Sequence, residues 1–168
     1  PWTLPANQAI CLSPGIWYSF VQVGSEAFVL ATELVESVSK ACGFPVDEKW
    51  GPQMVGHEKL FEGLLCRRPF SEGLSPILLS DFVTKDQGTG CVHIAPGHGQ
   101  EDYGLALAYN NEPEKKVKLL APLEVLAPVD SRGRFTDEVP EFQGLKVFEA
   151  NPRINEKLKE KGLLLNRV

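Results

Sequence analysis

The stretch Gly88–Tyr103, GTGCVHIAPGHGQEDY, places two histidines, two carboxylates and four glycines within sixteen residues. Its apolar part, 91–94, predicts a short buried strand, and the Ala-Pro-Gly that follows predicts a turn. The apolar run 103–109 then predicts a helix with acidic residues in its first turn. Because strand, glycine-rich turn and helix follow one another directly, they can bring His93 and Asp102 to the mouth of one site.

Each of these residues also has an ordinary structural interpretation. His93 alone is more typical of a hydrogen-bonded core imidazole than of a functional group. Glu101 and Asp102 can simply complement the dipole of the helix that they begin, and the glycines can serve turns. The combination of these residues, with small side chains between them that leave room for a ligand, favours a binding site.

A second motif begins the chain, where Pro1–Asn7 reads PWTLPAN. In this order, the two motifs are similar to those of the editing domain inserted in isoleucyl-tRNA synthetases, which are class I aminoacyl-tRNA synthetases. The related valyl enzymes usually carry lysine at the position of His93, so the isoleucyl resemblance is preferred. It covers essentially the whole chain and implies a single editing domain, residues 1–168, excised from a larger synthetase.

The rest of the sequence predicts a mainly β fold with inserted helices. Residues 17–23 and 26–30 read as two strands about the turn Gly24-Ser25. Thr32 is the expected cap of a helix that ends at Gly43 and Pro45. Further short strands are expected around 54–55, 64–66, 77–79, 82–83, 92–94, 117–120, 125–129 and 145–148. So many short strands suggest a closed or nearly closed β-barrel, the type assigned to valyl, leucyl and isoleucyl editing domains.

The last helix is expected to follow Asn151-Pro152, because proline is well tolerated in a first turn. Ile154 and Leu158 would form its apolar side, and three lysines would form a solvated face. The region 112–126 is expected to be a surface excursion.

Composition limits the partners that this chain can have. Its 168 residues are 43% hydrophobic, which suffices for one buried core, and its net charge is −5. A broad phosphate-binding face is therefore unexpected, and any contact with nucleic acid should be narrow.

The four cysteines lack C-x-x-C spacing and should be reduced thiols. No signal peptide or membrane span is recognisable, so a cytoplasmic protein is expected, or a mitochondrial or plastid one if a targeting segment was removed.

The resemblance implies proofreading: hydrolysis of valine wrongly esterified to tRNA(Ile), with clearance of valyl-adenylate left open. A synthetic pocket that accepts isoleucine rejects the smaller valine by only about 1–3 kcal/mol. A second site must therefore admit valine and exclude isoleucine by steric overlap. The expected partners are the 3′ end of tRNA(Ile) carrying valine and the remainder of the synthetase, and ATP would serve only the parent enzyme.

The resemblance also suggests roles for single residues. Asp102 would bind the α-ammonium group of the substrate by a charge-assisted hydrogen bond. His93 would lie against the aliphatic side chain and the ester as a steric wall, with a hydrogen bond to the terminal ribose as its alternative role. Asp102 and His93 are the catalytic candidates. Trp2 and Thr3 would form the opposite side of the valine pocket, and Asn7 would shape the motif.

Glycine-rich segments are the candidates for the terminal adenosine and phosphate, because glycine permits close backbone approach. They are Gly88-Thr89-Gly90 and Gly97-His98-Gly99. Positioning of a water molecule can supply most of the acceleration, so no covalent intermediate is expected. No cofactor is expected, and no metal, because the spacing of His93, His98 and Asp102 matches no specific zinc pattern. A thiol nucleophile at Cys91 and a zinc site at His93, His98 and Asp102 are weaker alternatives.

One departure from the family keeps a second function open. Intact enzymes carry threonines just before the Pro-Trp-Thr motif, whereas this sequence begins at Pro1. The chain is therefore also considered as a module that binds valine or the tRNA acceptor end with little turnover.

Overall fold

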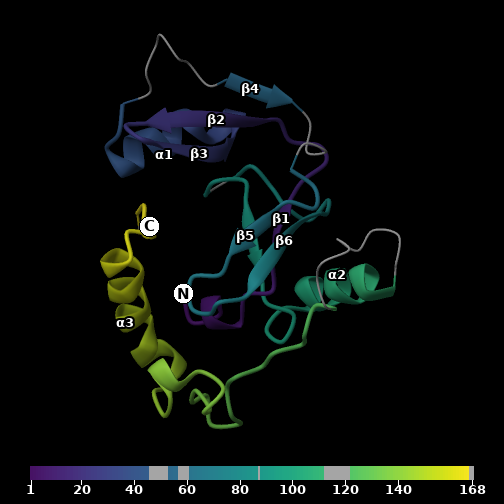
Figure 1. The fold of residues 1–168 in the computed structure, drawn as a ribbon, viewed down its shortest axis with the longest axis vertical. Coiled ribbons are helices and arrows are strands. Elements are labelled where there is room, and N and C mark those ends of the chain that lie inside the picture. The colour runs from purple at the N-terminus through teal and green to yellow at the C-terminus, as the bar shows by residue number, and fades with distance from the viewer. Residues whose placement is uncertain (46–52, 57–60, 87, 112–121, 167–168) are drawn as a thin grey trace. The chain divides into compact units, whose positions relative to one another are not determined.

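The computed structural model describes residues 1–45, 53–56, 61–86, 88–111 and 122–166, with the backbone alone for 53–56. The chain divides into two compact units, coloured along the sequence in Figure 1. The first unit contains residues 1–8, 67–75 and 94–168, and the second contains 9–66 and 76–93. The chain passes between them four times, the last time between His93 and Ile94. That residues 1–168 form a single domain stays a prediction.

The predicted hairpin is confirmed in the second unit. Strands β2 (Tyr18–Val23) and β3 (Glu26–Ala31) pair antiparallel, and the pair Val23 and Glu26 encloses a two-residue turn. Gly24 has a φ of +61° in this turn, a conformation that glycine adopts without strain. Strand β4 (Gln53–Gly56) pairs with the other side of β2, which gives the strand order β3-β2-β4.

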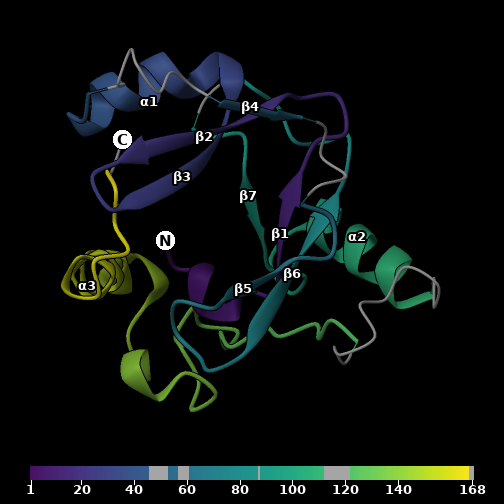
Figure 2. The same ribbon diagram turned by 45° about the horizontal axis from the view of Figure 1, so that its top comes forward.

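The predicted helix follows this hairpin as η2 (Thr32–Leu34) and α1 (Val35–Cys42), and it ends at Gly43 with φ +72°. Figure 2 shows α1 lying along the β3-β2-β4 sheet. Three apolar side chains of the helical segment are buried in the same core as Tyr18 and Leu30. They are Leu34, Val35 and Val38. The capping role predicted for Thr32 is wrong, because its hydroxyl lies 2.8 Å from the buried hydroxyl of Ser19 instead.

A second sheet has the strand order β5-β6-β1-β7. Its strands are β5 (Leu65–Arg67), β6 (Leu74–Leu79), β1 (Ala9–Leu12) and β7 (Val92–Ile94). Strands β1 and β6 run parallel, with Ile10 opposite Ile77. Sequence patterns predicted three of these strands and missed β1.

The closed barrel that the sequence suggested is not found among the described residues, whose strands form two separate sheets. Two of the short apolar runs behind that expectation, 82–83 and 125–129, contain no strand beyond one isolated bridge at Val129. The predicted strand 117–120 and most of the predicted excursion 112–126 lie outside the described residues.

The first unit contains η1 (Leu4–Ala6), α2 (Gln100–Asn111), η4 (Pro140–Phe142) and α3 (Val147–Glu160). Helix α3 buries Ala150, Ile154 and Leu158, spaced four residues apart, against Phe142 and its neighbours. The strand predicted at 145–148 is wrong, because α3 already begins at Val147 and Pro152 lies inside it. The backbone N–H of Lys146 donates to Glu149 Oε2 at 3.2 Å, a contact that favours this earlier start. No described helix is long and apolar enough to cross a membrane.

Candidate functional site

The Gly88–Tyr103 stretch has the predicted strand, turn and helix in succession, but the strand is not buried as predicted, because Val92 is exposed. Strand β7 ends at Ile94, the backbone N–H of His98 donates to the carbonyl of Ala95 at 2.9 Å, and α2 begins at Gln100. The turn is packed tightly, because a Cβ added at Gly97 would overlap the carbonyl oxygen of Leu126. The segment at Leu126 therefore packs directly against the turn that precedes the helix.

Asp102 lies in the first turn of α2, and its two carboxylate oxygens have different surroundings. Oδ2 accepts a hydrogen bond from the backbone N–H of Ala95 at 2.7 Å, which fixes the side chain across the turn. Oδ1 accepts no hydrogen bond from any residue within the described part of the chain. The half-buried carboxylate thus keeps one oxygen for a cation.

His98 lies in the turn that precedes this helix and contacts Trp2. The two ring centroids are 4.8 Å apart at an interplanar angle of 71°, an edge-to-face contact. Nε2 of His98 is buried and has no hydrogen-bond partner among the described residues. Burial lowers the pKa of His98, and the nearby carboxylate of Asp102 opposes this effect. The neutral imidazole is therefore favoured at pH 7.

Trp2 is fixed in turn by α3. Its backbone N–H donates to Asn151 Oδ1 at 3.0 Å, and its ring packs against the core around Phe142. The first unit therefore brings together three predicted residues, Trp2, His98 and Asp102. Sequence reasoning missed the supporting role of Asn151, which it recognised only as the start of a helix.

The other predicted residues of the first motif have structural contacts. Thr3 precedes η1, and its carbonyl accepts from the backbone N–H of Ala6 at 3.0 Å. Asn7 is buried, with 6% of its surface exposed, and its Oδ1 accepts from the hydroxyl of Ser75 at 2.5 Å. No sequence pattern singled out Ser75, and the role of Asn7 in shaping the motif stays a prediction.

The predicted residues Gly88, Thr89 and Gly90 lie in the second unit. Gly88 and Gly90 have φ of +72° and +75°, and the carbonyl of Gly90 accepts from the buried hydroxyl of Tyr18 at 2.8 Å. The carbonyl of Thr89 accepts from the backbone N–H of Ala31 at 2.8 Å. This segment is therefore held against the hairpin, and its contact with a terminal adenosine stays a prediction.

His93 also belongs to the second unit, on β7 between exposed Val92 and buried Ile94. It is itself half-buried. Burial raises the pKa of the nearby Cys91 thiol to about 11, so its thiolate is scarce at neutral pH and the thiol is a poor nucleophile. All four cysteines are free thiols, as the sequence predicted. The described residues contain no group of three or more histidine, cysteine, aspartate or glutamate side chains that could hold a metal ion.

Residues 43–159 match a family model described as leucyl-tRNA synthetase, editing domain. The isoleucine–tRNA ligase of Nitratidesulfovibrio vulgaris is 46% identical over 98% of this chain, and that of Persephonella marina is 46% identical over 99%. The chain spans only 16% of the length of either relative.

A solved structure shares the fold. The crystal structure of GlLeuRS-CP1 aligns with 97% of this chain and 77% of its own, with a TM-score of 0.72. The two sequences are 13% identical over this alignment, so the likeness concerns the fold alone.

Proposed function

From the premise that this chain belongs to the leucyl-tRNA synthetase editing-domain family, and resembles isoleucine–tRNA ligases, we propose that it hydrolyses the valyl ester of Val-tRNA(Ile). Isoleucine would be excluded by its size. The remainder of an isoleucyl-tRNA synthetase and the 3′ end of tRNA(Ile) are the proposed partners. We also propose that the reaction needs no cofactor and that the protein is cytoplasmic.

The carboxylate of Asp102 is the observation that carries the proposal. An aminoacyl ester differs from most esters in the cell by its free α-ammonium group, which needs an anionic partner. Asp102 Oδ2 is held by the N–H of Ala95, so Oδ1 can receive the ammonium with little loss of side-chain freedom. A hydrogen bond to a charged group contributes about 1.5–3 kcal/mol, enough to orient the ester.

Trp2 and His98 supply the next parts of the proposed site. Their edge-to-face contact forms a rigid aromatic surface in the same unit as Asp102, suited to limit the space for an aliphatic side chain. An extra methylene forced into a rigid pocket costs about 1–3 kcal/mol, which is the scale of the proposed discrimination against isoleucine. The lowered pKa of His98 keeps this aromatic surface uncharged at pH 7, as a contact with an aliphatic side chain requires.

The reaction needs a water molecule attacking the ester carbonyl, a stabilised tetrahedral oxyanion and release of the ribose hydroxyl. Aminoacyl esters are reactive, so positioning of substrate and water can supply much of the acceleration without a protein nucleophile. The raised pKa of Cys91 agrees with this mechanism. The role of His93 as a wall against the side chain and ester stays a prediction, which a His93→Ala variant tests by its Val-to-Ile selectivity.

A substitution of Asp102 tests the function directly. Asp102→Asn keeps an oxygen that can accept from Ala95 but removes the charge, so deacylation of Val-tRNA(Ile) should fall roughly 10- to 100-fold in kcat/KM. Glu101→Gln is the matched control, because this exposed neighbour also lies in the first turn of α2 and should tolerate the change. Equal rates for the Asp102→Asn variant and the native chain would sink the proposal. Valine-analogue binding without turnover in the native chain would identify the binding-only module instead.

A further inference from the structure

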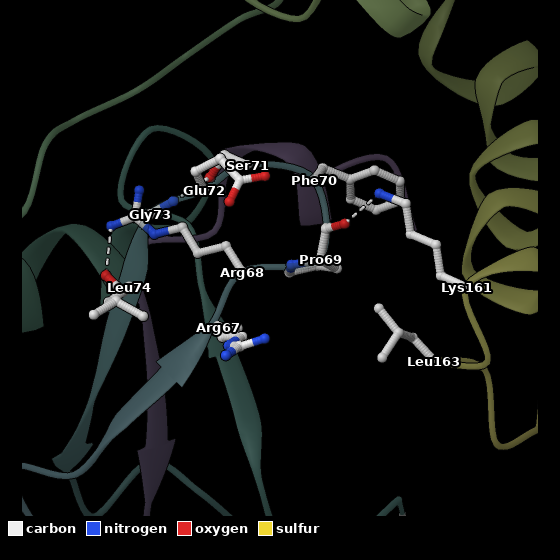
Figure 3. A pocket seen from close by; sticks show the side chains of 10 residues that line it. All are labelled: Arg67, Arg68, Pro69, Phe70, Ser71, Glu72, Gly73, Leu74, Lys161 and Leu163. Atoms are coloured by element: carbon white, nitrogen blue, oxygen red, sulfur yellow. Dashed lines mark hydrogen bonds between the residues drawn. The ribbon is translucent and has the colours of Figure 1, made fainter.

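A cavity of about 870 Å³ lies in the first unit, and none of the residues assigned above lines it. It is formed by the turn after β5, the start of β6 and the residues that follow α3. Figure 3 shows the side chains that line it. They include three cations, Arg67, Arg68 and Lys161, but one carboxylate, Glu72. This local excess of positive charge contrasts with the net charge of −5 of the whole chain.

Arg68 is partly buried, yet its hydrogen bonds all reach neutral acceptors. Nε donates to Ser75 Oγ at 3.1 Å, and Nη2 donates to Gln8 Oε1 at 3.2 Å and to the carbonyl of Leu74 at 3.1 Å. No carboxylate of the described residues lies within ion-pair distance of its guanidinium. Burial lowers the pKa of Arg68, although the charge of Glu124 opposes this. A guanidinium fixed in one orientation without a paired anion is suited to receive one.

Lys161 and Arg67 complete the positive lining. Figure 3 shows Lys161 reaching from the end of α3 toward Pro69 and the Phe70 ring. The carbonyl of Pro69 accepts from Nζ at 2.8 Å, and the ammonium lies 5.1 Å from the centre of the ring. Arg67 is exposed, and its guanidinium has no hydrogen bond or ion pair with any residue within the described ranges. None of the three cations is therefore neutralised by a carboxylate within the described chain.

We infer that this cavity binds a backbone phosphate of RNA, through Arg67 and Arg68 with Lys161 beside them. This inference rests on the proposed function, in which the chain binds the 3′ end of a tRNA. Because the chain is acidic, its contact with RNA should be confined to a small positively charged surface. The exposed guanidinium of Arg67 and Nη1 of Arg68, which donates to none of the three acceptors named above, can each donate to the oxygens of a phosphodiester. The half-buried Phe70 offers an apolar wall for the adjoining nucleoside. One such cavity provides a narrow contact of this kind.

The test measures binding of a fluorescent single-stranded RNA oligonucleotide with the tRNA 3′ sequence and no amino acid, over a series of KCl concentrations. Arg67→Gln should weaken binding several-fold and reduce the slope of log K against log [salt] by about 0.7 for the lost phosphate contact. Arg153→Gln is the matched control, because Arg153 is an exposed arginine of α3 outside the cavity. It should leave both quantities unchanged.

A second variant reaches Arg68 without removing its charge. A Cβ at Gly73 would lie 3.1 Å from Cδ, Nε and Cζ of Arg68, so Gly73→Ala should displace the guanidinium and weaken RNA binding as well. Equal losses of RNA affinity in the Arg67→Gln and Arg153→Gln variants would overturn the inference. It would also be overturned if the cavity bound inorganic phosphate but Arg67→Gln left the RNA affinity intact. Asp102→Asn separates the two proposals, because it should impair deacylation and preserve RNA affinity. Unaltered RNA binding by Arg67→Gln in a chain that still deacylates would refute the cavity alone.

Discussion

At the scale of single residues, Asp102 and His98 influence each other within the first unit. The carboxylate raises the pKa of the imidazole and burial lowers it, with burial the larger effect. The result is a neutral ring beside a carboxylate. The two residues therefore have different proposed roles. Asp102 attracts the ammonium group, and His98 presents an uncharged surface and one buried nitrogen.

This arrangement predicts how His98 titrates. Its pKa should lie below the ordinary value of 6.5, and Asp102→Asn should lower it further, because the opposing charge is lost. Imidazole resonances followed by NMR as a function of pH would measure both values, with Glu101→Gln as the control. A pKa at or above 6.5 in the native chain, or a rise on Asp102→Asn, would contradict the burial argument.

The same shift has a consequence for stability. The folded state disfavours protonation of His98, because its pKa is lower in the folded state than in the unfolded state. The stability that neutral His98 contributes is therefore fully present above the unfolded-state pKa and is lost as the pH falls through the folded-state pKa. Chemical denaturation should therefore show a decline in the free energy of unfolding below about pH 6.5 that is smaller in His98→Gln. An identical pH profile in the two proteins would show that His98 does not contribute.

At the scale of elements, the strand, turn and helix of the Gly88–Tyr103 stretch depend on the packing of the turn. Gly97 lies against the backbone of Leu126, with the carbonyl carbon 2.7 Å and Ala127 Cβ 3.0 Å from the place of an added Cβ. The segment at Leu126 therefore supports the turn that aims Asp102. No sequence pattern distinguishes this glycine from one that serves only a turn.

Gly97→Ala should consequently destabilise the protein by about 1–3 kcal/mol through overpacking, and displace Asp102 enough to slow deacylation. Gly104→Ala is its control, because Gly104 lies inside α2 with nothing within 4 Å of an added Cβ. That change should stabilise the helix by up to about 1 kcal/mol. Thermal unfolding of both variants decides the matter, and a Gly97 variant as stable as the native chain would exclude the tight packing.

Elements coded by local patterns were predictable from the sequence. The hairpin about Gly24, helix α1 ending at Gly43, and the strand-turn-helix order around His93 all depend on near neighbours. Elements that depend on distant contacts were not. Strand β1 is four residues long and pairs in parallel with β6, which is distant in the sequence, so neither alternation nor a turn indicated it. The apolar run 145–148 resembled a strand, but contacts at the start of α3 made its end helical.

The candidate site followed the same rule. The sequence predicted Trp2, His98 and Asp102 as site residues from two compact motifs, and the structure brings these three together. Their roles stay predictions. The sequence could not identify Asn151 or Ser75, which support Trp2 and Asn7 through hydrogen bonds across 149 and 68 residues of sequence. A barrel was wrongly inferred from the number of short apolar runs, because periodicity does not say which runs pair.

At the scale of the whole molecule, an acidic chain carries one positively lined cavity and one fixed carboxylate with a free oxygen, both within the described residues of its first unit. This division of charge suits a ligand with an anionic backbone and a cationic end group, which is the chemistry of an aminoacyl-tRNA 3′ end. The chain corresponds to 16% of the length of its isoleucine–tRNA ligase relatives, so the activity of the whole enzyme is a separate question.

The most direct measurement compares deacylation of Val-tRNA(Ile) and Ile-tRNA(Ile) by this chain under identical conditions. The proposed size exclusion predicts that the valyl ester is hydrolysed about 5- to 150-fold faster, the ratio that corresponds to about 1–3 kcal/mol of overpacking. The preference should depend on Asp102. Equal hydrolysis of the two esters, or a faster loss of the isoleucyl ester, would contradict the account.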